Sequence, residues 1–217
     1  MDGGLNPRQR LLVLLAQRAW LVGDFVLASG QRSPVYLDAR RVTFHPLGQA
    51  LLGPLALRAL RQRGWGPRAV GGLTLGADPV AVAIARASVD EGPLVHAFTV
   101  RKEAKAHGTG RRIEGGFEPG WPVVVVEDVL STGASARTAA EALREAGARV
   151  LGVLALVDRE MGGAEALAAA GLPVHALFRL TEIRAAAARL SKPEPERHQH
   201  QEESEQAPHG AGPELVR

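Results

Sequence analysis

The segment 123-VVVVEDVLSTGAS-135 predicts the central part of the fold. Four consecutive valines indicate a strand that is buried on both faces, which is typical of a parallel sheet covered by helices. Two acids, Glu127 and Asp128, follow at the carboxyl end of this strand. A loop of small residues comes next, and an Ala/Glu/Arg-rich stretch that ends at Gly147 predicts a helix. The segment therefore predicts a strand, a polar turn and a helix in direct succession.

The same pattern repeats on both sides of this segment. Apolar runs predict strands, and the Ala-rich stretches between them predict helices. This alternation predicts an α/β fold whose mostly parallel sheet is flanked by helices. We expect strands near 69–74, 95–100, 123–126, 150–157 and 174–180, helices at 79–90, 134–146 and 163–170, and a long polar loop from residue 101 to about 116.

The sequence before residue 69 has a different organisation. Asn followed by Pro is a typical helix start, and Gly64 is a typical helix end. Pro54, inside the second expected helix, predicts a kink or a break. We expect a helix from Asn6 to about Trp20, a hairpin-like unit with short strands at 25–27 and 35–37, and a helix from Pro46 to Arg63.

The composition excludes several classes of protein. With 217 residues, 46% of them hydrophobic, the chain is long enough for one α/β domain and short for two. Cysteine is absent, which excludes disulfides, thiolate metal sites and cysteine nucleophiles. No apolar run reaches the roughly 20 residues of a membrane span, and the N-terminus lacks the order of a signal peptide, so we expect a cytoplasmic protein without a membrane partner. The net charge of +3 is weak evidence for a nucleic-acid partner, and we expect none.

The residues after Glu127 and Asp128 predict a binding site for a sugar phosphate. Backbone N–H groups at a helix start bind phosphate together with the helix dipole, and Gly133 lets the backbone approach closely. A Walker A loop is excluded because the sequence has no G-x-x-x-x-G-K-[ST]. Two carboxylates would repel a phosphate, but they can accept strong hydrogen bonds from sugar hydroxyls. The alternative is a structural turn in which Ser131 or Thr132 caps the helix.

The stretch from Val124 to Ser135 resembles the signature that binds 5-phosphoribosyl-1-pyrophosphate (PRPP) in type I phosphoribosyltransferases. The shared pattern is an apolar strand, two acids, apolar residues and a small hydroxyl-Gly loop. The resemblance implies the type I phosphoribosyltransferase fold. It also implies that PRPP is bound by Glu127, Asp128, Val129, Leu130, Ser131, Thr132, Gly133, Ala134 and Ser135.

Two lysines lie in the loop that follows the second expected core strand. The chain has only three lysines, at positions 102, 105 and 192, against 23 arginines. Two lysines so close together indicate a need for compact, mobile ammonium groups. Departure of pyrophosphate from a ribose builds negative charge that such cations stabilise, and a lid over the site would exclude water. The alternative is a solvated run of charges on the surface.

The stretch 101-RKEAKAHGTG-110 resembles the R-K-x-x-K-x-H-G-x-G motif of orotate phosphoribosyltransferases. The resemblance implies transfer of the 5-phosphoribosyl group of PRPP to N1 of orotate, giving orotidine 5'-monophosphate and pyrophosphate in pyrimidine synthesis. Arg101, Lys102, Lys105 and His107 would bind the pyrophosphate, with Lys105 as the catalytic cation. Mg²⁺ would be bound through PRPP rather than directly by protein side chains. In the family this loop reaches into the neighbouring subunit, which implies a homodimer with shared active sites.

Two further segments resemble elements of this family. Residues 25–38 are similar to the F-x-L-x-S-G-x-x-S-P element that covers the base, and Arg159 stands in a D-R motif. The resemblance implies that Ser131 and Arg159 bind orotate, whose carboxylate suits an arginine. Two lysines that some members carry are absent from this chain, which has Ala28 and Gly76 at those places.

The resemblance also suggests a division of the chain into three parts. Residues 1–45 would form an N-terminal helix and a hood over the base site, and residues 46–190 would form the PRPP-binding α/β core. Residues 191–217 are rich in Glu, Gln, His and Pro. Because such a composition cannot bury enough apolar surface to offset the entropy of ordering, we expect a disordered tail there.

Two other functions are compatible with parts of the sequence. A phosphoribosyltransferase for another base, such as a purine, would share the PRPP loop but not the lysine-bearing motif. A PRPP-sensing regulator that binds nucleic acid would share the fold, and the basic body of the chain is compatible with it. The sequence contains no recognisable helix-turn-helix or aromatic-rich RNA-binding face.

Overall fold

A six-stranded sheet forms the centre of the molecule. The structure, a computed structural model, describes residues 4–26, 30, 32–103 and 112–191. The strands are β3 (Ala69–Leu73), β4 (His96–Val100), β5 (Ile113–Gly115), β6 (Pro122–Leu130), β7 (Arg149–Asp158) and β8 (Val174–Arg179). Their order across the sheet is β5-β4-β3-β6-β7-β8, and all neighbours are parallel except β5, which is antiparallel to β4. The predicted α/β fold with a mostly parallel sheet is confirmed.

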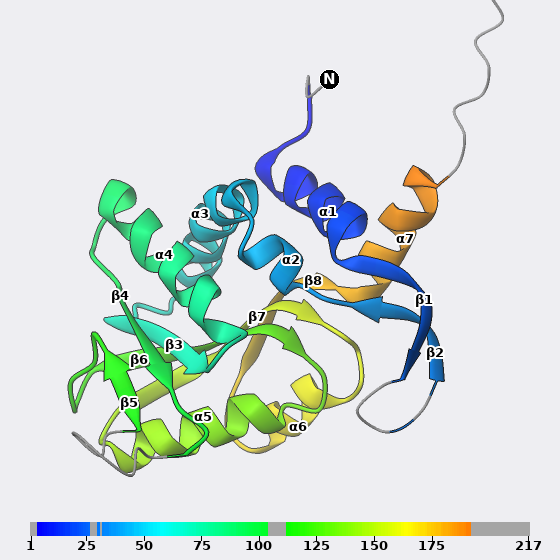
Figure 1. The fold of residues 1–217 in the computed structure, drawn as a ribbon. Helices are drawn as coiled ribbons and strands as arrows, with labels where there is room; N and C mark the ends of the chain where they lie inside the picture. The colour runs from blue at the N-terminus through cyan, green and yellow to red at the C-terminus, as the bar shows by residue number, and fades with distance from the viewer. Residues whose placement is uncertain (1–3, 27–29, 31, 104–111, 192–217) are drawn as a thin grey trace, which may run out of the picture.

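Helices cover both faces of this sheet (Figure 1). One face packs against α1 (Pro7–Arg18), α3 (Pro46–Gln62), α4 (Ala77–Glu91) and α7 (Leu180–Leu190). The other face packs against α5 (Ala134–Glu145) and α6 (Gly163–Ala169). Because the sheet is buried on both sides, its strands have apolar residues at consecutive positions. No helix in the described ranges is long and apolar enough to cross a membrane.

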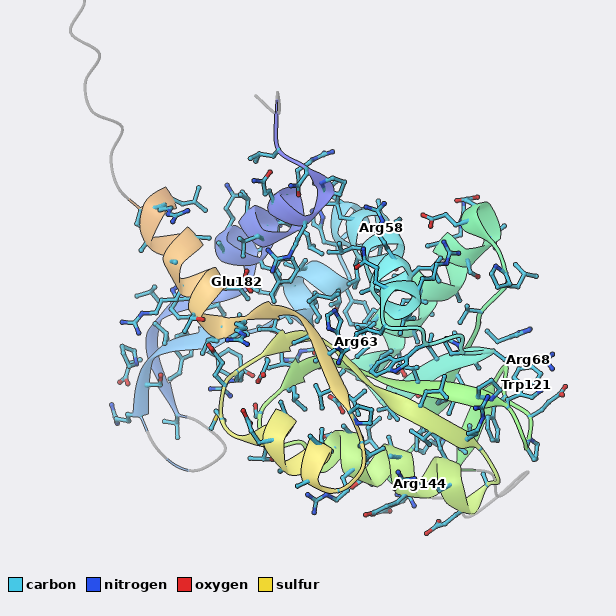
Figure 2. All side chains as sticks on the ribbon, turned by 180° about the vertical axis from the view of Figure 1, so that it is seen from behind. Arg58, Arg63, Arg68, Trp121, Arg144 and Glu182 are labelled. Carbon is cyan, nitrogen blue, oxygen red and sulfur yellow. The ribbon has the colours of Figure 1, made fainter. Side chains whose placement is uncertain are left out.

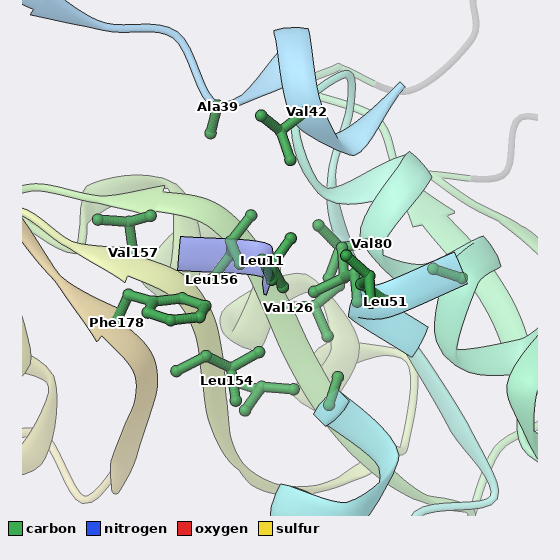
Figure 3. Packing of buried hydrophobic residues seen from close by; sticks show 14 of the residues in the cluster. Leu11, Ala39, Val42, Leu51, Val80, Val126, Leu154, Leu156, Val157 and Phe178 are labelled. Carbon is green, nitrogen blue, oxygen red and sulfur yellow. The ribbon is translucent and has the colours of Figure 1, made fainter. Parts of the chain in front are cut away.

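The four valines of β6 divide between the two faces. Val124 and Val126 pack in the cluster that includes residues of α1, α3 and α4, whereas Val123 and Val125 pack in the cluster that includes residues of α5. Figure 3 shows Val126 in the first cluster, which also contains Leu11 of α1. All four valines are 0% exposed. Successive strand residues point to opposite faces, so β6 contributes equally to both cores.

A two-stranded antiparallel sheet, which we call the hood, precedes the core. Its strands are β1 (Trp20–Val26) and β2 (Arg32–Leu37), and the short helix α2 (Arg40–Thr43) follows. Helix α1 begins as predicted, because the Asn6 side chain accepts a hydrogen bond from the Gln9 N–H and the Gln9 side chain accepts one from the Asn6 N–H. The hairpin-like unit predicted around residues 25–37 also forms, although residues 27–29 and 31 lie outside the described ranges.

Of the kink or break predicted at Pro54, the break is wrong, because α3 continues through this residue. Proline lacks an N–H and leaves the carbonyl of Ala50 without its helical partner. Ala50 is exposed, so water can bind that carbonyl. The adjacent Gly53 lets α3 approach α4 closely, since a Cβ at this position would lie 2.2 Å from the Ala83 carbonyl oxygen. Tight packing on α4 therefore favours an intact helix.

Two elements differ from the sequence-based expectation. The long polar loop expected up to residue 116 contains β5, whose three residues pair with the edge strand β4. A strand this short has no periodicity to detect, and only backbone pairing defines it. The strand expected over 174–180 ends at Arg179, and Leu180 begins α7. Ile183 and Ala187 of this unexpected helix are buried in the core, so tertiary packing holds it in place.

The amino ends of the strands are closed by packed side chains. Arg68, just before β3, lies over the ring of Trp121, just before β6, with its guanidinium carbon 4.1 Å from the ring centroid (Figure 2). The His96 ring lies 5.2 Å from the same indole ring. A cation–π contact of this kind stabilises by about 0.5–1 kcal/mol where it is exposed. This edge of the sheet is therefore structural, and the polar turns lie at the opposite edge.

Candidate functional site

The carboxyl ends of the parallel strands border a cavity of about 910 Å³. Ligands of open α/β sheets bind at this edge, outside the carboxyl ends of the strands. The cavity is lined by residues 36–40 at the end of the hood, the turn 74–76 after β3, residues 101–103 after β4, and Asp128, Val129, Ser131 and Arg159. It thus brings together segments that are distant in the sequence.

A smaller cavity, of about 120 Å³, lies at the turn from β6 to α5 and is lined by Glu127 and residues 129–136. Gly133 caps α5 with a φ of +79°, in the left-handed region that favours glycine. A Cβ at this position would lie 2.8 Å from Cγ of Leu167. The first N–H groups of a helix have no carbonyl partners within it. The cavity therefore offers backbone donors and the positive end of a helix dipole to a phosphate group.

Val129 and Ser131 line both cavities, so the two are direct neighbours. Thr132, Ala134 and Ser135, which the sequence also placed in the PRPP site, line the smaller one. Leu130 differs from its neighbours, because its side chain is buried in the core and only 1% exposed.

Glu127 is the more deeply buried of the two acids, with 7% of its surface exposed. Its Oε1 has no hydrogen-bonding partner within the described residues. Loss of hydration and, to a smaller extent, the nearby Asp128 raise the pKa of Glu127 to about 8. A buried carboxyl group without a partner is costly to the fold, which is typical of a group that serves ligand binding.

Asp128 lines the larger cavity and accepts a hydrogen bond of 2.8 Å from the Val129 N–H at Oδ1. Burial raises the pKa of this carboxyl, whereas the backbone N–H groups and the Arg40 guanidinium oppose the increase. Arg40 itself lies on the hood side of the cavity, where its Nε is 2.9 Å from Oδ1 of Asp38. Acidic and basic groups from β6 and from the end of the hood therefore face one cavity.

Arg159 follows β7 and is held against the turn after β6. Its backbone N–H donates to the Leu130 carbonyl at 2.8 Å, and its Nη1 lies 3.5 Å from Ser131 Oγ. The Nε of Arg159 is buried and has no hydrogen-bonding partner among the described residues. The two residues that the sequence assigned to the base therefore lie together, with donor capacity on Arg159 still unused.

The turn after β3 is tightly packed against β6. A Cβ at Gly76 would lie 2.4 Å from Oδ1 of Asp128, so a side chain there would force the aspartate to move. The Thr74–Leu75 peptide bond is cis. The Thr74 hydroxyl donates to Oδ2 of Asp78 at 2.6 Å, which ties the turn to the start of α4. This turn offers backbone groups and one hydroxyl to the cavity, and no cation.

The lysine-bearing loop is described only in part. Arg101 and Lys102 line the cavity, and Arg101 Nε lies 2.8 Å from Oε1 of Glu114 on β5. Lys105 and His107 lie outside the described residues. Within the described ranges, no group of three or more His, Asp or Glu side chains could hold a metal ion.

Tyr36 and Asp38 lie in the 25–38 element that the resemblance places over the base, but sequence reasoning gave neither of them, nor Arg40, an individual role. Tyr36, Asp38 and Arg40 come from the end of the hood. The Tyr36 ring packs against Phe25 on the neighbouring strand with ring centroids 5.6 Å apart. Polar residues directly after a strand are the signal that could have indicated Asp38 and Arg40. Their position opposite Asp128 depends on how the hood docks, which no local pattern contains.

No protein-family model matches the chain. Its sequence is nevertheless similar to known proteins over most of its length. The orotate phosphoribosyltransferase of Aquifex aeolicus is 45% identical over 179 residues, which cover 81% of this chain and 97% of the relative. The chain belongs to the orotate phosphoribosyltransferase family. This membership agrees with the resemblance of residues 101–110 to the motif of orotate phosphoribosyltransferases.

Solved structures of orotate phosphoribosyltransferases share the fold. The Mycobacterium tuberculosis H37Rv enzyme in complex with Fe(III) dicitrate has a TM-score of 0.75 and 43% identity, over 82% of this chain and 99% of that chain. The same enzyme in complex with PRPP has a TM-score of 0.71 and 39% identity, over 82% and 99%. The fold expected from the sequence, that of the type I phosphoribosyltransferases, is therefore confirmed for this member of the orotate phosphoribosyltransferase family.

Proposed function

We propose that the chain transfers the 5-phosphoribosyl group of PRPP to N1 of orotate, giving orotidine 5'-monophosphate and pyrophosphate in de novo pyrimidine synthesis. The observation that carries this proposal is the acid pair of β6, which stands between a small cavity of about 120 Å³ at the start of α5 and a large cavity of about 910 Å³. Membership of the orotate phosphoribosyltransferase family supports the choice of substrates.

The two cavities suggest how PRPP is bound. The 5-phosphate would accept hydrogen bonds from backbone N–H groups in residues 131–135. Glu127 and Asp128 would accept hydrogen bonds from the ribose hydroxyls. C1 of the ribose, with its diphosphate, would then lie in the large cavity, because it is at the opposite end of the sugar from the 5-phosphate.

Orotate would bind in the same large cavity beside Arg159 and Ser131. The orotate carboxylate would pair with the Arg159 guanidinium, whose buried Nε has no hydrogen-bonding partner among the described residues. The end of the hood, with Tyr36, would cover the base. The pairing would place N1 of orotate against C1 of the ribose.

The reaction forms a bond between N1 of orotate and C1 of the ribose while the bond from C1 to the diphosphate oxygen breaks. The proton of N1 is released, and water or the departing diphosphate accepts it. The electron pair of the broken bond leaves on the diphosphate, so negative charge grows there. Arg101, Lys102, Lys105 and His107 would stabilise this charge, with Lys105 as the catalytic cation. Two of them, Arg101 and Lys102, line the cavity in which the diphosphate would lie.

Magnesium fits this arrangement as a cofactor that PRPP brings into the site. Mg²⁺ usually binds through one or two carboxylates, water and substrate phosphates. The cavity presents the carboxylates of Asp38 and Asp128, which is compatible with a metal held mainly by PRPP oxygens. When bound, the ion would neutralise charge on the leaving diphosphate.

The remaining parts of the proposal concern assembly, location and the division of the chain. We propose a cytoplasmic homodimer in which the lysine-bearing loop completes the site of the neighbouring subunit. Residues 1–45 would serve as helix and hood, residues 46–190 as the PRPP-binding core, and residues 191–217 as a disordered tail. The resemblance of residues 101–110 to the family's loop motif supports the dimer, and the Glu-, Gln-, His- and Pro-rich composition supports the tail.

A spectrophotometric assay of orotate loss with PRPP and Mg²⁺ tests the proposed function. We expect orotate to be consumed only when PRPP and Mg²⁺ are both present, with orotidine 5'-monophosphate as the product. Adenine, hypoxanthine and uracil in place of orotate test the alternative of another base. Failure to form orotidine 5'-monophosphate, or faster reaction with a purine, would overturn the proposal.

A further inference from the structure

Arg40 is a cation of the large cavity that the sequence motifs do not indicate. It begins α2 directly after the hood, and its side chain is 48% exposed. Oδ1 of Asp38 accepts hydrogen bonds from the backbone N–H of Arg40 at 3.3 Å and from the Nε of Arg40 at 2.9 Å. Within the described ranges, the two terminal amino groups of Arg40 have no hydrogen-bonding partner. Asp38 therefore orients the guanidinium while two of its nitrogens remain available to a ligand.

Arg40 and the turn 74–76 after β3 line the same cavity. Gln49 of α3 connects α2 to the start of α4, because its Nε2 donates to the Thr43 carbonyl and, at 2.9 Å, to the Pro79 carbonyl. Helix α4 follows the turn 74–76 directly. Figure 1 shows α2 between the hood and α3 on the helical layer above the sheet. The end of the hood and the turn after β3 are thus held in a common frame.

The turn after β3 lacks a cation, and its packing explains why. Gly76 has no room for a side chain unless Asp128 moves, since a Cβ would lie 2.4 Å from Oδ1. A lysine at this position would therefore conflict with the carboxylate that we assign to the ribose. Arg40 lines the same cavity as Gly76 and Asp128. The positive charge of Arg40 at the start of α2 therefore lies in the cavity that this turn also lines.

We propose that Arg40, oriented by Asp38, contacts the diphosphate of PRPP and supplies the positive charge that the turn 74–76 does not carry. The inference rests on the proposed function. A guanidinium whose Nε is already held presents its remaining N–H groups as a planar fork, which matches the oxygens of a phosphate. The carboxylate of orotate is the competing ligand for such a fork, and Arg159 is the group that we assign to it.

The test compares four variants with the unmodified protein, using Mg²⁺ with inorganic pyrophosphate as the probe in binding calorimetry. We expect Arg40→Ala to weaken pyrophosphate binding roughly tenfold to a hundredfold, which is the range for loss of charged hydrogen bonds. Arg40→Lys should show an intermediate loss, because it keeps the charge and loses the fork. Asp38→Asn should show a smaller loss in the same direction. Arg41→Ala removes an exposed arginine that does not line the cavity and should bind as the unmodified protein does.

Steady-state kinetics separates the two possible ligands of Arg40. We expect Arg40→Ala to raise KM for PRPP while KM for orotate changes less than about threefold. A rise confined to KM for orotate, or unchanged pyrophosphate binding in Arg40→Ala with an unchanged melting temperature, would overturn the inference. Equal losses in Arg40→Ala and Arg41→Ala would also overturn it, since they would indicate a general effect of charge. Formation of orotidine 5'-monophosphate by the unmodified protein tests the proposed function separately.

Discussion

Glu127 and Asp128 are consecutive residues of β6, yet their carboxyl groups line different cavities. Glu127 lines the small cavity at the start of α5, and Asp128 lines the large cavity beside the hood. The alternation of side chains along a strand produces this division. A ribose held by both carboxylates would therefore keep its 5-phosphate on the side of Glu127 and its reacting carbon on the side of Asp128.

We expect Glu127→Gln to stabilise the free protein, and the gain to grow with pH. Burial, with a smaller effect of Asp128, raises the pKa of Glu127 from 4.5 to about 8. Between these values the folded protein keeps a proton that the unfolded chain releases. The stability of the unmodified protein should therefore fall relative to the variant by up to about 1.4 kcal/mol per pH unit, and the difference should level off above the folded pKa.

Thermal unfolding at about pH 5, 7 and 9 measures this difference. Glu141→Gln, at an exposed position of α5, is the matched control and should follow the unmodified protein at each pH. A melting-temperature gain for Glu127→Gln that is the same at every pH would contradict the assignment of the raised pKa.

Asp128→Asn should weaken PRPP binding without unfolding the protein. The amide keeps the size of the side chain and an oxygen that can accept from the Val129 N–H. It loses the charge that strengthens hydrogen bonds from ribose hydroxyls, so we expect an affinity about tenfold to a hundredfold lower. Calorimetric titration with PRPP and Mg²⁺ measures the change, and an unaltered Kd would remove Asp128 from the site.

Gly133→Ala should destabilise the protein by more than the backbone alone explains. A left-handed conformation costs a residue with a Cβ about 1–2 kcal/mol. The Cβ would also lie 2.8 Å from Cγ of Leu167. Gly171→Ala is the matched control, because Gly171 has a φ of +71° and no atom within 4 Å of the added Cβ. Urea unfolding of both variants isolates the effect of crowding, and equal losses would show that Gly133 is not tightly packed.

Arg159→Ala should impair orotate binding more than PRPP binding. Removal of one partner of a charged, hydrogen-bonded pair typically weakens binding by about tenfold to a hundredfold. Steady-state kinetics should show a higher KM for orotate, with KM for PRPP changed less than about threefold. Arg144→Ala on the exposed side of α5 should leave both constants unchanged. A larger effect on PRPP than on orotate would reverse the assignment.

Lys105→Ala should reduce turnover strongly, by about a hundredfold or more, because it removes a cation from the developing charge on the diphosphate. The segment around it contains no run of apolar residues, so we expect the melting temperature to stay the same. Lys192→Ala changes the third lysine of the chain and should keep full activity. Normal turnover in Lys105→Ala would exclude this lysine from the mechanism.

The order of strands and helices in the core could be predicted because its signals are local. The valines of β6 and the alanines of α5 produce apolar runs of different length, and glycine and proline mark their ends. Three features escaped prediction. The edge strand β5 depends on pairing with β4, α7 depends on burial of residues such as Ile183, and α3 continues through Pro54 because of its packing on α4.

By itself, the sequence determined the α/β fold class, the acid pair with its glycine turn, and the family-specific lysine motif, because each of these features depends on residues that are neighbours in the chain. Only the tertiary structure decided that Arg40 and Asp38 face Asp128, that Gly76 has no room for a side chain, and that Arg159 lies beside Ser131. The physical reason is that these relationships join segments far apart in the chain. They arise from the docking of the hood and from the parallel order of β3, β6 and β7, which brings the carboxyl ends of separate strands to one edge.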